Sequence, residues 1–458
     1  MSGVDTGGAA AGPAVRTGPA AGAGGAAGTG ADTAVVTGIG VAAPNGLGTE
    51  AWWAATLRGE SGIRPITRYD ATKYPVRLAG LIPDFDAAAH LPGRLLPQTD
   101  RVTRLAVAAA DWALADSGAD PAELPEYGMS VVTSNATGGF EFTHREARKL
   151  WTKGPQHVSV YESFAWFYAA NTGQISIRHG MRGPGSVLVA DQAGGLDALG
   201  HARRTLRGGS SLVVSGGVES AFDPWGLVAH LSGGGVSTVA DPTRAYLPFD
   251  TGAAGHVPGE GGAVLIVESA AAAAARGAHQ VYGEIAGYAA TFDPAPGSGR
   301  PPGLERAARL ALSDAGLAAG DIDVVFADAA GVRERDDAEA AAIEALFGPY
   351  GVPVSVPKTL TGRLTGGGPP LDTAAALLSV RDGVLPAAAH VTRPVPGHRL
   401  DLVRGEPRPL RVRAALVLAR GHGGFNSALV VRAVEPGRGA ARGTTRPSVR
   451  ETAREDRP

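Results

Sequence analysis

The sequence contains no cysteine among its 458 residues, which excludes disulfides and any thiol nucleophile. It also lacks a strong charge of either sign, because 42 Lys and Arg oppose 44 Asp and Glu and leave a formal net charge of -2. Such a balance argues against nucleic acid or an anionic membrane as the main partner. No stretch approaches the 18 apolar residues of a membrane-spanning helix. With 44% hydrophobic residues, the composition favours one large or two fused globular domains.

Sites for metals and nucleotides are not expected. The histidines show no spacing typical of metal ligands. The glycine-rich stretches at 38–40 and 233–235 lack the downstream acidic residue of a dinucleotide fingerprint. We therefore predict that the protein uses neither a metal nor a cofactor.

The two ends differ in composition from the rest of the chain. Residues 1–31 are rich in Gly and Ala with Arg16 as their only base, and residues 435–458 are rich in Arg, Gly, Thr and Pro. Both have few large apolar side chains to offset the entropy of ordering, so we predict a disordered N-terminal extension and a disordered tail. The first segment also lacks the charged start and apolar centre of a signal peptide, so we expect a cytoplasmic location.

An internal repeat predicts the fold class. ALADSG at 113–118 recurs as ALSDAG at 311–316, each at the end of an Ala/Leu-rich amphipathic helix. A Val-Val pair of strand type follows each copy, at 131–132 and 324–325. Two similar βα halves, at 32–284 and 285–434, would form an α/β fold with strands between helical layers. The alternative is that this hexapeptide is merely a common helix C-terminus.

A strand is predicted to run directly into a helix at Gln192. Residues 186–190 are a short apolar run, and leucine and alanine then recur at helical spacing from Leu196 to Leu206, until two glycines end the pattern. The partial positive charge of a helix N-terminus would lower the pKa of a thiol placed at this junction. Gln192 carries a neutral amide without useful nucleophilicity. The sequence therefore predicts a site built for covalent catalysis that lacks its nucleophile.

The octet DQAGGLDA at 191–198, followed by GHARR at 200–204, resembles the ketosynthase β subunit, or chain length factor, of type II polyketide synthases. Further motifs of the β-ketoacyl synthase family agree with this resemblance: AVVTGIGV at 34–41 with PNG at 44–46, YLPFD at 246–250 with GHVPGEGG at 255–262, and GGFNSA at 423–428. The resemblance covers roughly residues 33 to 433. It implies a thiolase-type fold, with duplicated βα halves in a layered α/β/α/β/α architecture.

The remaining catalytic positions of the family can be compared by spacing. Condensing members hold two histidines and a lysine around the cysteine, with acidic residues eight and eleven positions after the first histidine. Asp336 and Glu339 fit those acidic positions, which places Asp328 where that histidine would stand. Lys358 is present, but Arg363 stands five residues later, where the second histidine would be. The resemblance thus implies a degenerate site formed by Gln192, Asp328, Lys358 and Arg363.

Two interpretations of this degenerate site remain open at the level of sequence. Gln192 either fills the space of a lost cysteine or assists the decarboxylation of malonyl groups that primes the chain. Asp328, Lys358 and Arg363 either form a buried, charge-paired plug or retain some proton chemistry, although a carboxylate and a guanidinium at ordinary pKa values cannot replace an imidazole.

Phe140, Thr143 and Ala147 are spaced i, i+3 and i+7 and share one face of a predicted helix. Ordinary packing would explain such a stripe. By resemblance, however, these positions match the helix that gates the polyketide tunnel between the two subunits. At 1.5 Å per residue, Ala147 lies roughly 10 Å deeper than Phe140. Members that make shorter chains carry a bulky residue at the deepest position, so alanine predicts a product longer than an octaketide.

The resemblance also implies the partners. The chain would form a heterodimer with a cysteine-containing ketosynthase α subunit, meet the acyl carrier protein through that complex, and enclose the poly-β-keto chain whose length it sets in antibiotic biosynthesis. One rival hypothesis is an autonomous thiolase-fold acyltransferase or hydrolase with a nucleophile such as Ser215 or Ser220, although neither serine has a histidine at a diagnostic spacing. Another is a structural homodimer without polyketide function.

Overall fold

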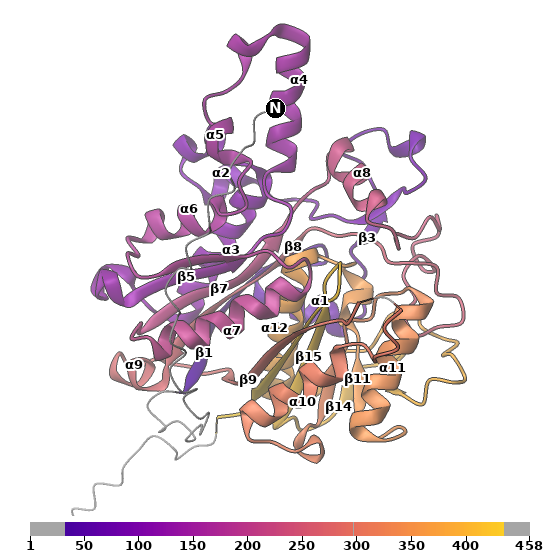
Figure 1. The fold of residues 1–458 in the computed structure, drawn as a ribbon. Coiled ribbons are helices and arrows are strands. Elements are labelled where there is room, and N and C mark those ends of the chain that lie inside the picture. Colours follow the sequence, from indigo (N-terminus) through magenta and orange to yellow (C-terminus); the bar gives the residue numbers. More distant parts are fainter. Residues whose placement is uncertain (1–32, 296, 435–458) are drawn as a thin grey trace, which may run out of the picture.

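The computed structural model describes residues 33–295 and 297–434 (Figure 1). The predicted disordered segments 1–31 and 435–458 lie outside these residues, and the boundary between halves at 284/285 stays a prediction. A 12-stranded mixed sheet runs through the molecule. In sheet order its strands are β13 (Asp401–Leu402), β11 (Pro353–Ser355), β10 (Val324–Phe326), β15 (Ala414–Arg420), β16 (Phe425–Arg432), β9 (Gly283–Phe292), β1 (Ala34–Ala43), β8 (Gly261–Ser269), β7 (Leu212–Glu219), β5 (Met129–Ser134) and β6 (Gly185–Leu188), with β2 (Gly46–Leu47) paired to β1.

The sheet consists of two halves with the same strand pattern. In one half β5 runs parallel to β6 and β7, while β7, β8 and β1 follow one another antiparallel. In the other half β10 runs parallel to β11 and β15, while β15, β16 and β9 follow antiparallel. The halves join where β1 and β9 pair antiparallel. This repetition confirms the predicted duplication.

Helices cover the two halves in layers. The described helices are α1 (Thr49–Leu57), α2 (Ala87–His90), α3 (Arg101–Ser117), α4 (Phe140–Lys153), α5 (Glu162–Ala165), α6 (Ala170–His179), α7 (Ala193–Arg207), α8 (Pro224–Ser232), α9 (Ala270–Ala275), α10 (Leu304–Ala315), α11 (Arg333–Phe347) and α12 (Gly368–Asp382). Both α7 and α12 contact strands of both halves and each other, whereas α3 and α6 pack on the first half and α10, with α11 beside it, on the second. This is the expected α/β/α/β/α architecture of the thiolase-type fold.

The sequence repeat marks one packing contact that occurs twice. A Cβ on Gly38 of β1 would lie 2.2 Å from the carbonyl oxygen of Ala113 in α3. A Cβ on Gly287 of β9 would lie 2.2 Å from the carbonyl oxygen of Ala311 in α10. Each helix approaches its strand this closely only because the strand carries glycine there. The repeated hexapeptide is therefore part of a duplicated strand–helix contact rather than a chance helix terminus.

The helix α4, with the short α5 after it, projects from the body of the molecule near α8 (Figure 1). Two small hairpin sheets, β3 (Ile63–Pro65) with β4 (Leu78–Gly80) and β12 (Val384–Leu385) with β14 (Arg408–Pro409), lie outside the main sheet. Within 33–295 and 297–434, no helix is both long and apolar enough to cross a membrane.

Candidate functional site

Gln192 lies where the chain turns from β6 into α7. The strand ends at Leu188, two residues before the predicted end at Ala190, because the chain tightens into a turn in which Asp191 has a φ of 50°. The Asp191 carboxylate accepts a hydrogen bond from the backbone N–H of His422 at 2.9 Å. Only 3% of Gln192 is exposed. The N-terminus of α7 would stabilise a thiolate at this position, but the amide of Gln192 carries no charge.

Asp328 is the centre of a buried network of ion pairs. Its Oδ1 lies 3.1 Å from Arg363 Nη2, and its Oδ2 lies 3.1 Å from Arg420 Nε. Arg420 also pairs with the buried Glu339, at 3.0 Å. Burial alone would raise the pKa of Asp328, but the Arg363 and Arg420 guanidiniums hold it well below its usual range. Asp328 is therefore an anion that is fully compensated by two cations.

Lys358 does not pair with the Asp328 carboxylate, as the predicted plug of Asp328, Lys358 and Arg363 would require. Its Nζ forms an ion pair with Asp372 of α12 at 2.7 Å, and it donates to the backbone oxygens of Ala327 and Asp328 at 2.5 and 3.2 Å. The second cation at Asp328 is instead Arg420. Sequence reasoning missed Asp372 and Arg420 because neither stands in the motifs that carry the resemblance, and no local spacing connects them to the residues they neutralise.

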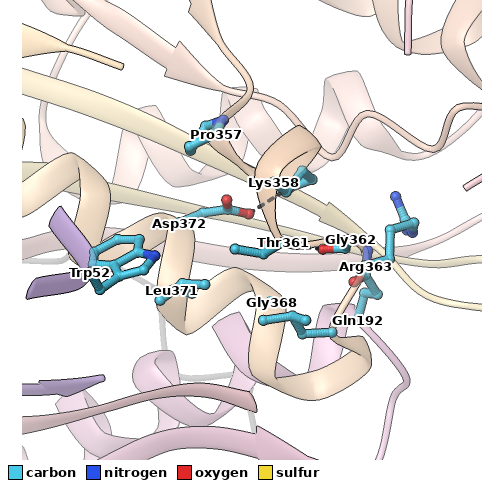
Figure 2. Close-up of a pocket in the computed structure, with 11 residues that line it drawn as sticks. Trp52, Gln192, Pro357, Lys358, Thr361, Gly362, Arg363, Gly368, Leu371 and Asp372 are labelled. Carbon is cyan, nitrogen blue, oxygen red and sulfur yellow. Dashed lines mark hydrogen bonds and ion pairs between the residues drawn. The ribbon is translucent and has the colours of Figure 1, made fainter. Parts of the chain in front are cut away.

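The amide of Gln192 lies beside Arg363 of this network (Figure 2). In one orientation its Nε2 donates to Asp328 Oδ1 at 3.3 Å. The orientation that turns its oxygen toward Arg363 satisfies the amide better, since the oxygen then accepts from Nε at 3.0 Å and Nη1 at 3.2 Å. In both orientations the side chain is held by groups that cannot exchange a proton near pH 7.

Little space remains at the site. The cavity has a volume of about 10 Å³, which is room for about one water molecule. Figure 2 shows its wall, with Trp52 at one side and Gln192 beside Arg363 at the other. It is lined by Trp52, Gln192, Pro357, Lys358, Thr361, Gly362, Arg363, Leu364, Gly368, Leu371 and Asp372. A cavity of this size does not admit an acyl thioester.

A histidine near the network does not restore acid–base chemistry. Burial, reinforced by the positive charge of Arg363, lowers the pKa of His256 to about 3. Its imidazole is thus neutral at pH 7 and a very weak base, whereas a general base works best with a pKa near the operating pH. The small cavity and the ion pairs that hold its charged side chains favour the structural interpretation, a plug that occupies the place of a catalytic centre.

The structure places the three predicted gate residues together on α4. Phe140, Thr143 and Ala147 are all half-buried, whereas Phe142 and Glu146, on another face, are buried. Figure 1 shows this helix standing out from the body. The common face that the sequence predicts is thus present, and the role of these residues as a tunnel wall stays a prediction.

Large apolar side chains are exposed on and around α4. The ring of Phe140 lies 5.5 Å from that of Trp225 in α8, which sequence reasoning did not single out. The exposed group in this part of the chain comprises Leu150, Trp151, Val160, Trp166, Phe167, Trp225 and Val228. Exposed apolar side chains grouped in this way, unlike single exposed leucines, are typical of surfaces through which proteins bind other molecules. We call these seven residues the α4 apolar face.

The absence of native cysteine makes the plug directly testable. A Gln192→Cys chain should react with iodoacetamide at least about 100-fold more slowly than a Ser313→Cys chain, because only local opening can expose position 192. Ser313 is exposed on α10 and provides the matched control. Mass spectrometry under native conditions measures both rates, and unfolding should make them equal. Equal rates in the folded state would mean that the site is open.

Two family models match most of the chain. Beta-ketoacyl synthase, N-terminal domain, matches residues 31–273, and Beta-ketoacyl synthase, C-terminal domain, matches residues 282–392. These matches agree with the motifs and with the duplicated fold.

Curated relatives cover nearly the same length. The chain is 65% identical to the actinorhodin polyketide putative beta-ketoacyl synthase 2 of Streptomyces coelicolor, over 88% of this chain and 99% of that protein. It is 60% identical to the tetracenomycin polyketide synthase ketoacyl synthase beta subunit of Streptomyces glaucescens, over 87% and 98%. Among solved structures, the ishigamide ketosynthase/chain length factor superposes with a TM-score of 0.79 at 27% identity, over 88% of this chain and 99% of that one.

Proposed function

This chain belongs to the β-ketoacyl synthase family, and we propose that it works there as a non-condensing subunit that needs a cysteine-bearing partner. It is a ketosynthase β subunit, or chain length factor, of a type II polyketide synthase. The observation that carries this function is the filled catalytic site, in which Gln192 replaces the nucleophile and the Asp328 network replaces the histidines. The relatives at 60 to 65% identity support the same assignment.

The exposed surface supports a heterodimer with a ketosynthase α subunit. The strand β6 lies at the edge of the described sheet, where its outer side is available to a further strand. The α4 apolar face adds large aromatic side chains, which are enriched at interfaces between proteins. Obligate interfaces commonly bury more than about 2,000 Å². We infer that the α subunit covers the α4 apolar face.

Within the heterodimer, the α subunit carries out acyl transfer from the acyl carrier protein, malonyl decarboxylation and condensation. This chain forms part of the tunnel wall through Phe140, Thr143 and Ala147 on α4, and so limits how many two-carbon units are added. The growing poly-β-keto chain is its ligand. The described cavity leaves Gln192 no room to act on a malonyl thioester, which argues against a role in decarboxylation. A cytoplasmic location remains a prediction.

An autonomous hydrolase or acyltransferase is less well supported. Ser215 is 0% exposed within β7. Ser220 is 1% exposed, and its hydroxyl donates to Glu260 Oε2 at 2.7 Å. A nucleophile must reach its substrate and needs a base beside it. Neither serine offers both.

Co-expression with a cysteine-containing α subunit tests the proposed function. We expect a 1:1 complex by light scattering that builds a poly-β-keto chain from malonyl-carrier protein, whereas this chain alone is poorly soluble or a weak homodimer and makes no product. A thiol-directed ketosynthase inhibitor should label only the α subunit, and replacing the α cysteine should abolish activity. Condensation by the isolated chain would contradict the proposal, and a stable soluble monomer would contradict the obligate pairing.

A further inference from the structure

Asp100 caps two helices at once. It is 2% exposed and stands at the N-cap position of α3, where its Oδ1 accepts a hydrogen bond from the Val102 N–H at 2.9 Å. Its Oδ2 accepts from the Phe142 N–H at 2.7 Å. Phe142 is the third residue of α4, and its N–H is one of those that a helix leaves without an internal acceptor. One buried carboxylate thus joins the first turns of α3 and α4.

The chain before α4 cannot supply a cap of its own. The N-cap residue is Gly139, which has no side chain to accept a hydrogen bond. A Cβ at this position would lie 2.0 Å from the backbone oxygen of Ala165, so close packing against α5 requires glycine. Gly138, with a φ of 65°, would place a Cβ 2.4 Å from the backbone oxygen of Trp166. The capping group therefore has to come from another element, and Asp100 provides it.

This bond fixes α4 relative to the core. The helix α3 is firmly packed, since Leu105 and Val107 are 0% exposed, whereas α4 projects from the body (Figure 1). At 1.5 Å per residue, Ala147 lies roughly 7.5 Å along the axis from Phe142. A shift of α4 at Phe142 therefore moves the predicted gate by the same amount.

We propose that Asp100 is a positioning residue for product length, because it sets the depth at which α4 holds Phe140, Thr143 and Ala147. This inference rests on the proposed function, and it adds a determinant that does not touch the growing chain. A second contact lies nearby, where His144 of α4 pairs with Asp223, the N-cap of α8. That contact holds a side chain of α4, whereas Asp100 holds its backbone.

Asp100→Ser is the most direct test in the heterodimer. Serine is a strong N-cap residue, so it keeps the bond to Val102, but its single short hydroxyl does not reach Phe142. We compare the amount of the main polyketide with the amount of the products that are one two-carbon unit longer or shorter. We expect this ratio to fall by about fivefold, because a displacement of α4 by a fraction of an ångström changes the geometry of the reaction. Hydrogen exchange should become faster at the Phe142 amide and stay unchanged at Val102.

Asp100→Asn provides a second variant, because an asparagine presents one acceptor to two N–H groups. Asp120→Ser is the matched control, since Asp120 caps the exposed turn 121–123 through the Ala122 N–H at 2.9 Å without contacting α4. This control should leave product lengths unchanged. An unchanged product ratio in both Asp100 variants would overturn the proposal, as would loss of the complex in both variants while the control still assembles.

The Ala147→Phe variant, run in the same assay, separates this inference from the function on which it rests. If Ala147→Phe changes product length and the Asp100 variants do not, the positioning role of Asp100 alone fails. If none of the three changes product length, the gate itself is wrong.

Discussion

Asp328→Ala is expected to lower the free energy of unfolding by about 3 to 5 kcal/mol, which is the typical cost of removing one partner from a buried ion pair. Arg363 and Arg420 would lose the carboxylate that lies 3.1 Å from each of them. Glu339 would remain to compensate Arg420, so most of the cost falls on Arg363. Urea denaturation of the purified protein, in the same oligomeric state as the wild type, measures this change.

Glu305→Ala is a suitable control for Asp328→Ala. Glu305 forms an i,i+4 ion pair with Arg309 on the exposed side of α10, at 2.7 Å. Pairs of this kind contribute less than about 1 kcal/mol. A loss of stability at Asp328 no larger than at Glu305 would show that the network is not a buried plug.

The same network predicts a dependence on pH. The pKa of Asp328 in the folded state lies below its ordinary value. The contribution of Asp328 to the free energy of unfolding is therefore fully present above the unfolded-state pKa of about 3.9, and it is lost as the pH falls toward the folded-state pKa. Between pH 5 and 3 the wild type should therefore lose stability more steeply than Asp328→Ala. Parallel curves for the two proteins would contradict the lowered pKa.

Ala147→Phe should shorten the polyketide by one or more two-carbon units. Condensation slows once the acyl end can no longer reach the position from which it reacts, and a phenyl ring fills space that alanine leaves open. A neighbouring bulky side chain could set the stop in place of Ala147. Phe142 is 1% exposed and so is held away from a tunnel, whereas Trp166 is 48% exposed and remains a candidate. Liquid chromatography with mass spectrometry of the products made by the mutant heterodimer measures the length.

Thr152→Phe places the same bulk on another face of α4 and serves as the control for Ala147→Phe. Thr152 is exposed, so the added ring should leave product length unchanged. Normal yield and unchanged length for Ala147→Phe would mean that Ala147 is not the gate. Loss of the heterodimer would mean that Ala147 packs directly against the α subunit.

Much of the site could be predicted because its residues belong to local motifs. The strand-to-helix junction at Gln192 follows from periodicity, and the counted spacings led to Asp328 and Arg363, which the structure brings into contact. Arg420 and Asp372 escaped prediction for a physical reason. The partner of a buried charge is decided by which elements meet in three dimensions, and Arg420 stands at the end of β15, 92 residues from Asp328.

In the fold, too, features set by neighbouring residues could be predicted from the sequence, whereas features set by contacts in three dimensions could not. The repeat at 113–118 and 311–316 predicted the duplication, because it records a local contact between a helix and a glycine-bearing strand. Periodicity also placed Phe140, Thr143 and Ala147 on one face of a helix. It did not reveal that Glu146 is buried on another face of α4, where Lys149 and the Ser159 N–H satisfy its carboxylate.

The ion pairs around Asp328 also make the loss of catalysis hard to reverse in evolution. A return to condensing chemistry would need a cysteine at Gln192 and histidines at Asp328 and Arg363. Replacing Asp328 alone leaves Arg363 without its carboxylate, at a cost of about 3 to 5 kcal/mol, against a typical total stability of only about 5 to 15 kcal/mol. Replacing Arg363 alone leaves Arg420 as the one guanidinium for the two buried carboxylates of Asp328 and Glu339. Each single step back therefore passes through a weakened protein. Selection against such destabilised intermediates would keep this chain from regaining catalysis, so the two subunits would stay dependent on each other.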